Sequence, residues 1–251
     1  MIDLHCHPLP GLDDGCPTAE DGVALLVGLA RLGFSTVVAT PHVRNGLWDN
    51  RLGTRRAGLE KLLPGLEKAR AGGATLPTLE LAGEHMFDDV LTDLLARGEA
   101  LTYPGGGASL VEFSYDAIPH RVELQLWRMK RSGVRPILAH PERYAPVQAD
   151  PERYEELLGA GALGVLDVMS LVGAYGRRAQ ACAERLVSLG RYRAACSDAH
   201  KPADLEPLSE ALGVLKARVG AEGYRKLLVD GPRAILEEAR SAPPGAPRRV
   251  P

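Results

Sequence analysis

Short runs of apolar residues recur along the chain, and a segment with helical spacing of its apolar positions follows most of them. Each run is four or five residues long, which is typical of a buried strand and too short for a buried helix. We predict strands at Ile2–His5, Thr36–Thr40, Leu79–Ala82, Ser109–Glu112, Pro136–Ala139, Gly164–Val168 and Ala194–Ser197.

The segments between these strands have the pattern of amphipathic helices. Thr18 and Asp150 stand where the N-caps of two of them are expected. We predict helices at Ala19–Leu32, Arg51–Ala71, Asp88–Arg97, Arg121–Arg131, Glu152–Leu158, Arg177–Leu189, Leu205–Val219 and Gly223–Glu237.

This alternation of strand and helix predicts an α/β fold with a parallel sheet. Seven strands at regular intervals favour a closed barrel over an open sheet, although the pattern does not establish closure. The chain has 251 residues and no internal repeat. We therefore predict one domain over residues 1–240, followed by a disordered, Pro-rich tail over residues 241–251.

Composition and charge narrow the possible functions. Hydrophobic residues make up 45% of the chain and charged residues 25%, and the net charge is −2. These values are ordinary for a globular protein and favour neither nucleic-acid binding nor a polybasic membrane contact. No apolar run approaches the roughly 20 residues of a membrane helix. Without a signal segment or a CxxC pattern, we predict a reduced, cytoplasmic protein.

Histidines and carboxylates gather where the predicted strands end. In parallel α/β barrels, the carboxyl ends of the strands meet at one rim, where catalytic groups lie. Six of the seven strands deliver such residues, and the candidates are His5, His7, Asp14, His42, Glu84, Glu112, His140, Asp198 and His200.

The spacing of these residues indicates metal binding. His5 and His7 are two positions apart and project to the same side of a strand, as do Asp198 and His200. Mixed imidazole and carboxylate ligands suit Zn²⁺, Mn²⁺ or Fe²⁺ better than Ca²⁺. Nine ligands are too many for one ion and suffice for two or three if a carboxylate bridges. A lone histidine is more often structural, and we assign His85 and His120 to that class.

Several motifs resemble those of the polymerase-and-histidinol-phosphatase (PHP) superfamily. They are "DLHCHPLPGLDDG", "TPHVRNG", "GEHMFDD", "VEFSY", "HPERY" and "SDAH". The opening motif and "HPERY" are most similar to those of the bacterial PHP-type protein-tyrosine phosphatases of capsule and exopolysaccharide systems. The resemblance spans roughly residues 1–240.

The resemblance implies a distorted (β/α)₇ barrel with three divalent metals, Mn²⁺ first and Fe or Zn as alternatives. It implies that His5, His7, Glu84 and Asp198 hold one ion, and that Glu84 bridges to a second ion shared with Glu112 and His140. It also implies that Asp14, His42 and His200 hold the third ion.

The implied reaction is hydrolysis of phosphotyrosine on a protein. The implied protein substrate is the tail of a bacterial tyrosine kinase. A metal-activated hydroxide would attack phosphorus in line. Arg143 matches a phosphate-contacting arginine, with a salt bridge as its alternative role, and Arg44 is a weaker candidate. None of the four cysteines has an arginine six positions later, so cysteine-dependent phosphatase chemistry is excluded. Cys6 should be a packed core thiol.

Two departures from the family pattern leave substrate preference open. "KPADLEPL" follows "SDAH" without an arginine and offers only Lys201, and "GVLDVMS" lacks an asparagine-like residue. The alternatives are a small-molecule phosphoesterase, such as a histidinol-phosphate phosphatase, and a module that binds metal without catalysis. Asp13 has no predicted role, and the oligomeric state is undetermined.

Overall fold

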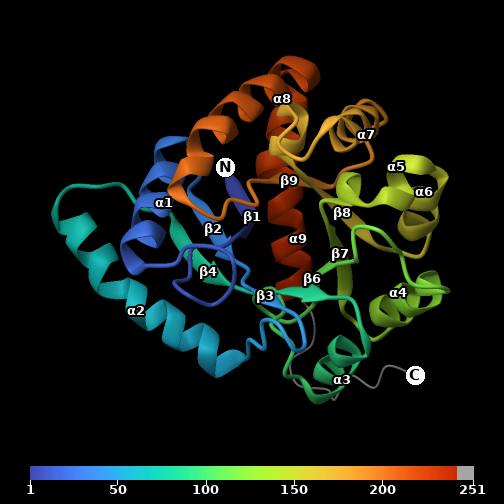
Figure 1. Ribbon diagram of the computed structural model, residues 1–251, viewed down its shortest axis with the longest axis horizontal. Coiled ribbons are helices and arrows are strands. Elements are labelled where there is room, and N and C mark those ends of the chain that lie inside the picture. The colour runs from blue at the N-terminus through green and yellow to red at the C-terminus, as the bar shows by residue number, and fades with distance from the viewer. Residues whose placement is uncertain (242–251) are drawn as a thin grey trace.

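A parallel β-barrel surrounded by helices forms the body of the protein (Figure 1). The structure is a computed structural model that describes residues 1–241, so the predicted tail lies almost wholly outside the described residues and the domain boundary stays a prediction. The strands are β1 (Ile2–Cys6), β2 (Thr36–Ala39), β3 (His42–Val43), β4 (Thr78–Leu81), β5 (Glu84–Met86), β6 (Ala108–Glu112), β7 (Arg135–Ala139), β8 (Leu163–Asp167) and β9 (Ala194–Cys196).

The strands form two hydrogen-bonded sheets, β1-β2-β4 and β3-β5-β6-β7-β8-β9, which join into one barrel. On one side, β2 runs into β3 and β4 runs into β5, each after a two-residue break in the pairing. On the other side, His7 N donates to Ala199 O and Asp198 N donates to His5 O, both at 2.9 Å. If β2 and β3 are counted as one strand, and β4 and β5 as another, the barrel has seven strands. The predicted seven-stranded (β/α) barrel is confirmed.

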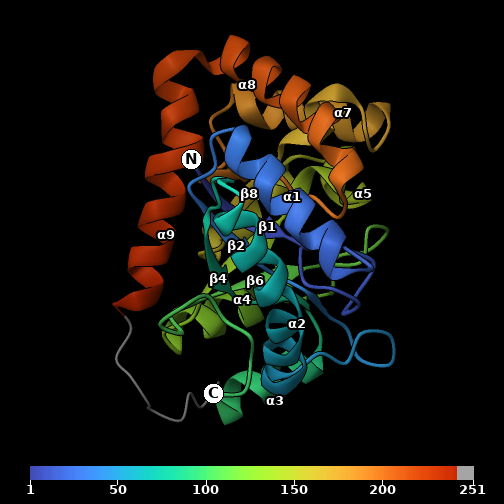
Figure 2. The same cartoon turned by 90° about the vertical axis from the view of Figure 1, so that its left-hand side faces the viewer.

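Helices wrap the barrel and close one end of it (Figure 2). They are α1 (Ala19–Arg31), α2 (Leu52–Ala71), α3 (Asp89–Arg97), α4 (Val122–Arg131), α5 (Ala145–Ala149), α6 (Glu152–Gly159), α7 (Arg177–Ser188), α8 (Leu205–Arg225) and α9 (Gly231–Arg240). Ile235 and Leu236 of α9 pack on the residues that fill the barrel, among them Leu4 and Ile137. Because α9 covers the amino ends of the strands, the carboxyl ends remain for the site.

The structure differs from the predicted elements in two ways: it contains short elements that were not predicted, and it joins helices that were predicted as separate. β3, β5 and α5 are only two, three and five residues long, below the length that periodicity can detect. The two predicted C-terminal helices run on as α8, with a kink at Gly220 (φ 69°), and reach α9 through a π-helical turn at Lys226–Asp230.

Local contacts agree with most of the smaller predictions. Thr18 Oγ1 accepts a hydrogen bond from Asp21 N at the start of α1, as an N-cap does. Asp150 Oδ1 accepts from Glu152 N, although Pro151 is the residue directly before α6. Cys6 is fully buried, and its thiol donates to Ala199 O. Within residues 1–241, no helix combines the length and apolar character that crossing a membrane requires.

Candidate metal centre

The barrel brings the predicted ligands together at the carboxyl ends of its strands. They form three overlapping groups whose ligand atoms lie within 4.8 Å of one another. The groups are His5, His7, Glu84 and Asp198; His42, Glu84 and Glu112; and His7, Asp14, His42 and His200. His140 is the remaining candidate, and it contacts the first two groups through Glu84.

The first group is entirely buried. His5 Nε2 lies 2.9 Å from Glu84 Oε2 and 3.0 Å from Asp198 Oδ1. His7 Nε2 lies 3.3 Å from the same Asp198 oxygen. Two imidazole nitrogens and two carboxylate oxygens therefore face a common centre, which is the composition of a transition-metal site.

Glu84 links the first group to the second. Its Oε2 lies 3.0 Å from His42 Nδ1, and its Oε1 lies 3.1 Å from His140 Nε2. Glu112 Oε1 lies 3.3 Å from the same nitrogen of His42. One carboxylate thus presents its two oxygens to different neighbours, the arrangement that a bridging ligand needs.

The third group is more open. Asp14 Oδ1 lies 3.5 Å from His42 Nε2 and 3.6 Å from His200 Nε2, and the Asp14 side chain is 54% exposed. The rings of His7 and His200 stack with centroids 4.1 Å apart. His42 contacts both groups, with Nδ1 toward Glu84 and Nε2 toward Asp14. The resemblance places His42 with the third ion, and its Nε2 atom fits that place.

Unpartnered buried atoms test whether these residues fit metal ions. His42 Nδ1 and Asp198 Oδ1 are buried without a hydrogen bond of normal geometry among the described residues, and both atoms face other candidate ligands. Buried polar atoms are normally satisfied, so orphans concentrated in one cluster indicate a missing partner. The borderline donor set and the orphaned Asp198 oxygen both fit divalent cations.

Electrostatic interactions within the cluster also keep its carboxylates ionised, which is the form that binds cations. Burial alone would raise the pKa of Glu84, but His5 and His42 outweigh it and hold that pKa well below its usual value. Burial would lower the pKa of His42, but Glu84 and Glu112 outweigh it and raise the pKa to about 11. The pKa of Asp198 is likewise held far down by His5 and His7 despite burial. These carboxylates stay ionised and can bind cations.

Asp13, which had no predicted role, supports two of the candidate ligands. Its Oδ2 lies 2.8 Å from His7 Nδ1 and accepts a hydrogen bond from His42 N at 2.9 Å. A carboxylate on Nδ1 fixes the ring and leaves Nε2 free to bind metal. The signal available from sequence was an aspartate a few residues after a candidate histidine, but its direction depends on the loop.

Two candidate ligands have left-handed backbone conformations. His140 has φ 33° and Asp198 has φ 48°, a region that residues other than glycine seldom occupy. Each stands directly after, or two residues after, the end of its strand, β7 or β9. The turn directs each side chain across the rim toward Glu84 or His5 instead of along the strand.

Arg143 reaches the rim from the short 3₁₀-helix Pro141–Arg143. Its Nη1 donates to Asp198 Oδ2 at 2.7 Å, and its Nη2 donates to Tyr115 Oη at 2.5 Å. The guanidinium carbon lies 4.8 Å from the Tyr115 ring centroid and 4.1 Å from that of Tyr175. Arg143 therefore has the alternative salt-bridge role, and it is also held beside the metal cluster.

Asp167 is a rim residue that sequence reasoning missed. It is fully buried at the end of β8, and its Oδ2 lies 3.6 Å from Arg143 Nη1. The segment "GVLDVMS", in which we looked for an asparagine-like residue, thus supplies an aspartate instead. Each of the seven barrel strands therefore ends in a polar side chain near the centre.

The remaining candidates lie farther from the centre. Arg44 is exposed on the loop after β3, whose Trp48 ring stacks on His42 with centroids 4.8 Å apart. His85 is buried and accepts a hydrogen bond from Leu101 N, and burial is the main cause that lowers its pKa to about 3. His120 is exposed. Neither belongs to the three groups, in agreement with their structural assignment.

Comparisons with known proteins agree with this arrangement. Tyrosine-protein phosphatase YwqE of Bacillus subtilis (strain 168) is 31% identical over 88% of this chain and 86% of its own length. Tyrosine-protein phosphatase CpsB of Streptococcus pneumoniae is 26% identical over 94% of this chain and 98% of its own.

A solved structure extends the likeness to the fold. It comes from crystal structures of YwqE and CpsB, described as metal-dependent tyrosine phosphatases, and matches with a TM-score of 0.85 and 28% identity over 95% of both chains. The family model "Capsular polysaccharide synthesis, CpsB/CapC" matches residues 1–237. This chain therefore belongs to the CpsB/CapC family.

Proposed function

We propose that this protein is a metal-dependent tyrosine-protein phosphatase of capsule synthesis. The observation that carries the proposal is the convergence of nine histidines and carboxylates on one rim of the barrel, beside Arg143. The family and the relatives' activity support the same reaction. A metal-binding module without catalysis would not need an arginine at the edge of the cluster.

We assign three divalent ions to the nine candidate ligands, divided as the family resemblance implies. His5, His7, Glu84 and Asp198 would hold one ion; Glu84, Glu112 and His140 a second; and Asp14, His42 and His200 a third. Mn²⁺ is our first choice, and Fe or Zn suits the same nitrogen and oxygen donors. Bound ions supply positive charge to the phosphate oxygens and lower the pKa of a water toward neutrality.

The residues of the chain position and hold the phosphate. Arg143 offers a planar guanidinium that suits phosphate oxygens, and its side chain is 15% exposed beside the cluster. Asp198, Tyr115 and Tyr175 fix its plane, so less rotamer entropy is lost when phosphate binds. Arg44 lies on a more exposed loop and is the weaker candidate for a second phosphate contact.

The substrate we propose is a phosphotyrosine protein, namely the tail of a bacterial tyrosine kinase. We place the reaction in the cytoplasm. A flexible tail suits a centre that lies at an open rim, because an extended segment can place its phosphotyrosine there. Free cysteines at all four positions agree with a reducing compartment.

The test compares three substrates on protein loaded with Mn²⁺. We expect faster hydrolysis of a phosphotyrosine peptide than of histidinol phosphate or a phosphoserine peptide, and complete loss on chelation with recovery when metal returns. His5→Ala and Asp198→Ala should abolish turnover with the circular dichroism spectrum retained. A preference for histidinol phosphate would establish the small-molecule alternative. Bound metal without turnover would establish the non-catalytic one.

A further inference from the structure

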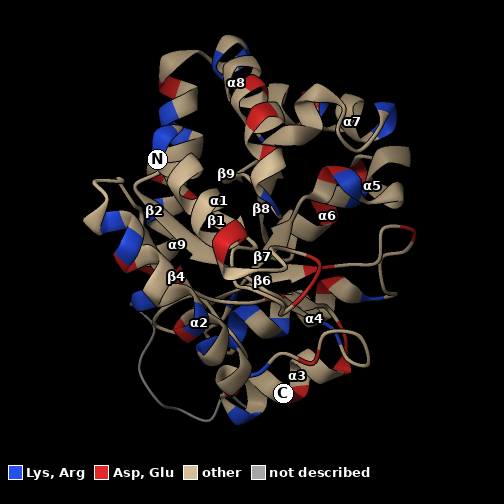
Figure 3. Cartoon of the chain, turned by 60° about the vertical axis from the view of Figure 1, so that its left-hand side comes forward, with Lys and Arg blue, Asp and Glu red and all other residues tan. Residues whose placement is uncertain are grey.

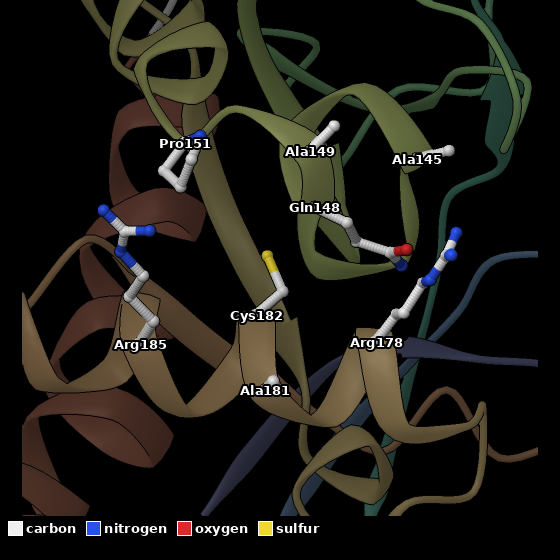
Figure 4. A pocket seen from close by; sticks show the side chains of 8 residues that line it. All are labelled: Ala145, Gln148, Ala149, Pro151, Arg178, Ala181, Cys182 and Arg185. Carbon is white, nitrogen blue, oxygen red and sulfur yellow. The ribbon is translucent and has the colours of Figure 1, made fainter.

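A cleft of about 460 Å³ lies between α5 and α7 on the outside of the barrel (Figure 4). Gln148 and Pro151 line one wall, and Arg178, Cys182 and Arg185 line the other. Figure 4 shows Arg178 and Arg185 toward opposite ends of the cleft, with Cys182 between them. Among residues 1–241, the two arginines are the only charged residues that line it.

Neither arginine is neutralised by a neighbour. Both are exposed, and neither guanidinium forms an ion pair with any residue in the described range 1–241. Other arginines of the outer helices do have carboxylate partners; Arg191 pairs with Glu155, and Arg218 with Glu184. Figure 3 shows basic residues on α7. The cleft therefore presents two uncompensated positive charges in a protein of net charge −2.

One end of the cleft is linked by a hydrogen bond to a residue that holds Arg143 in place. Its first lining residue, Ala145, donates its backbone N–H to Tyr115 O at 2.7 Å, and Tyr115 holds the Arg143 guanidinium. On the other wall, Arg178 follows three residues after Tyr175, the second ring against Arg143. Both walls of the cleft therefore begin within three residues of side chains that contact Arg143 or of Arg143 itself.

The spacing of the arginines defines what they can bind. Arg178 and Arg185 are seven positions apart on α7, which is two turns on one face and about 10 Å along the helix. In an extended peptide, side chains an even number of residues apart share one face, and four residues cover about 14 Å at roughly 3.4 Å per residue. Two carboxylates four residues apart would therefore share the face toward α7, within reach of the two long arginine side chains at opposite ends of the cleft.

We propose that this cleft binds an acidic segment of the substrate protein next to its phosphotyrosine. The inference rests on the proposed function, because it assigns a site to the chain that flanks the reacting residue. Gln148 Nε2 donates to Glu142 O, which leaves Gln148 Oε1 to accept from a peptide backbone, and the small side chains of Cys182 and the alanines leave room for an extended chain. The site then selects among phosphotyrosines by the charge of their neighbours.

The experiment measures binding of peptides with a non-hydrolysable phosphonate in place of phosphotyrosine. One peptide carries a pair of glutamates four residues apart on each side of this residue, so that the two members of a pair share one face, and its match carries glutamines. We expect the glutamate peptide to bind about fivefold more tightly at low salt, with the difference shrinking as salt rises. Arg178→Gln with Arg185→Gln should remove the difference.

Arg177→Gln is the matched control, because Arg177 is exposed on the same turn of α7 and does not line the cleft. It should keep the preference, and both variants should hydrolyse p-nitrophenyl phosphate like the unchanged protein. Equal affinity for the two peptides, or a preference that survives in the double variant, would overturn the proposal. Failure to hydrolyse any phosphotyrosine substrate would overturn the proposed function, while the affinities still decide on the cleft.

Discussion

Two loops border the centre and differ in how tightly they are held. The loop of residues 7–18, after β1, is bound to its surroundings: Asp13 contacts His7 and His42, and Cys16 N donates to His7 O. The loop of residues 44–51, after β3, is mostly exposed, and Leu47 is 57% accessible. It contacts the centre through the stack of Trp48 on His42 and through Asn50 Nδ2, which donates to His42 O at 2.8 Å.

The difference separates two requirements of such a site. Ligand atoms must stay close to one geometry, so the loop that carries Asp14 and supports His7 is packed and hydrogen-bonded. A protein substrate must approach from outside, so part of the rim must stay open. The variants below test whether this division between the loop of residues 7–18 and the loop of residues 44–51 is real.

His7→Gln should have the largest effect. His7 belongs to two of the three ligand groups, and glutamine offers no aromatic nitrogen to bind metal. We expect loss of detectable phosphatase activity and a lower metal content by elemental analysis. An unchanged metal content would show that His7 is not a ligand.

Gly15→Ala should come next. A Cβ at Gly15 would lie 2.5 Å from both Cβ and O of His7, so the loop would have to move. We expect about 1–3 kcal/mol of lost stability by denaturant unfolding, together with weaker metal binding.

Gly53→Ala is the matched control, at a glycine two residues beyond the loop of residues 44–51. Nothing lies within 4 Å of a Cβ at Gly53, in the first turn of α2. This change should leave stability equal or slightly higher, since alanine favours the helix. Similar losses in the two variants would contradict the packed character of the first loop.

Asp13→Asn should reduce metal affinity by about 10–100-fold, the usual cost of losing a carboxylate on a ligand histidine. Titration of the apoprotein with Mn²⁺ measures the change. Asp49→Asn is the control, because Asp49 lies in the second loop and pairs only with Arg51 at the surface. An equal affinity for Asp13→Asn and the unchanged protein would exclude the supporting role of Asp13.

Trp48→Leu should have the smallest effect. The ring stacks on His42 but donates no hydrogen bond to it, so metal affinity should stay within about twofold. A tenfold weaker affinity would show that the second loop also holds the metal ligands in place.

The fold was largely predictable because short apolar runs alternate regularly with segments of helical periodicity. Each of the seven predicted strands agrees with an observed strand to within about one residue at either end. β3 and β5 were not predictable, since two or three residues carry no periodicity. They arise because the sheet breaks after β2 and β4 and resumes beside the centre.

The candidate site was predictable as a set, and its supporting contacts were not. His5 and Glu84 stand at strand ends, where topology decides which residues meet. Asp13 and Asp167 depend instead on where a side chain points after a loop or a strand ends. Arg143 was singled out by its motif, but its contacts with Tyr115 and Tyr175 join segments far apart in sequence.

The left-handed backbone at His140 and Asp198 has a consequence for the evolution of this protein. Each conformation costs on the order of 1–3 kcal/mol, and glycine would adopt it without that penalty. Selection for heat resistance alone would therefore favour glycine at both positions and erase two candidate ligands. A stabilising glycine at either position would remove a candidate ligand, so variants from a thermostability screen should be assayed for turnover first.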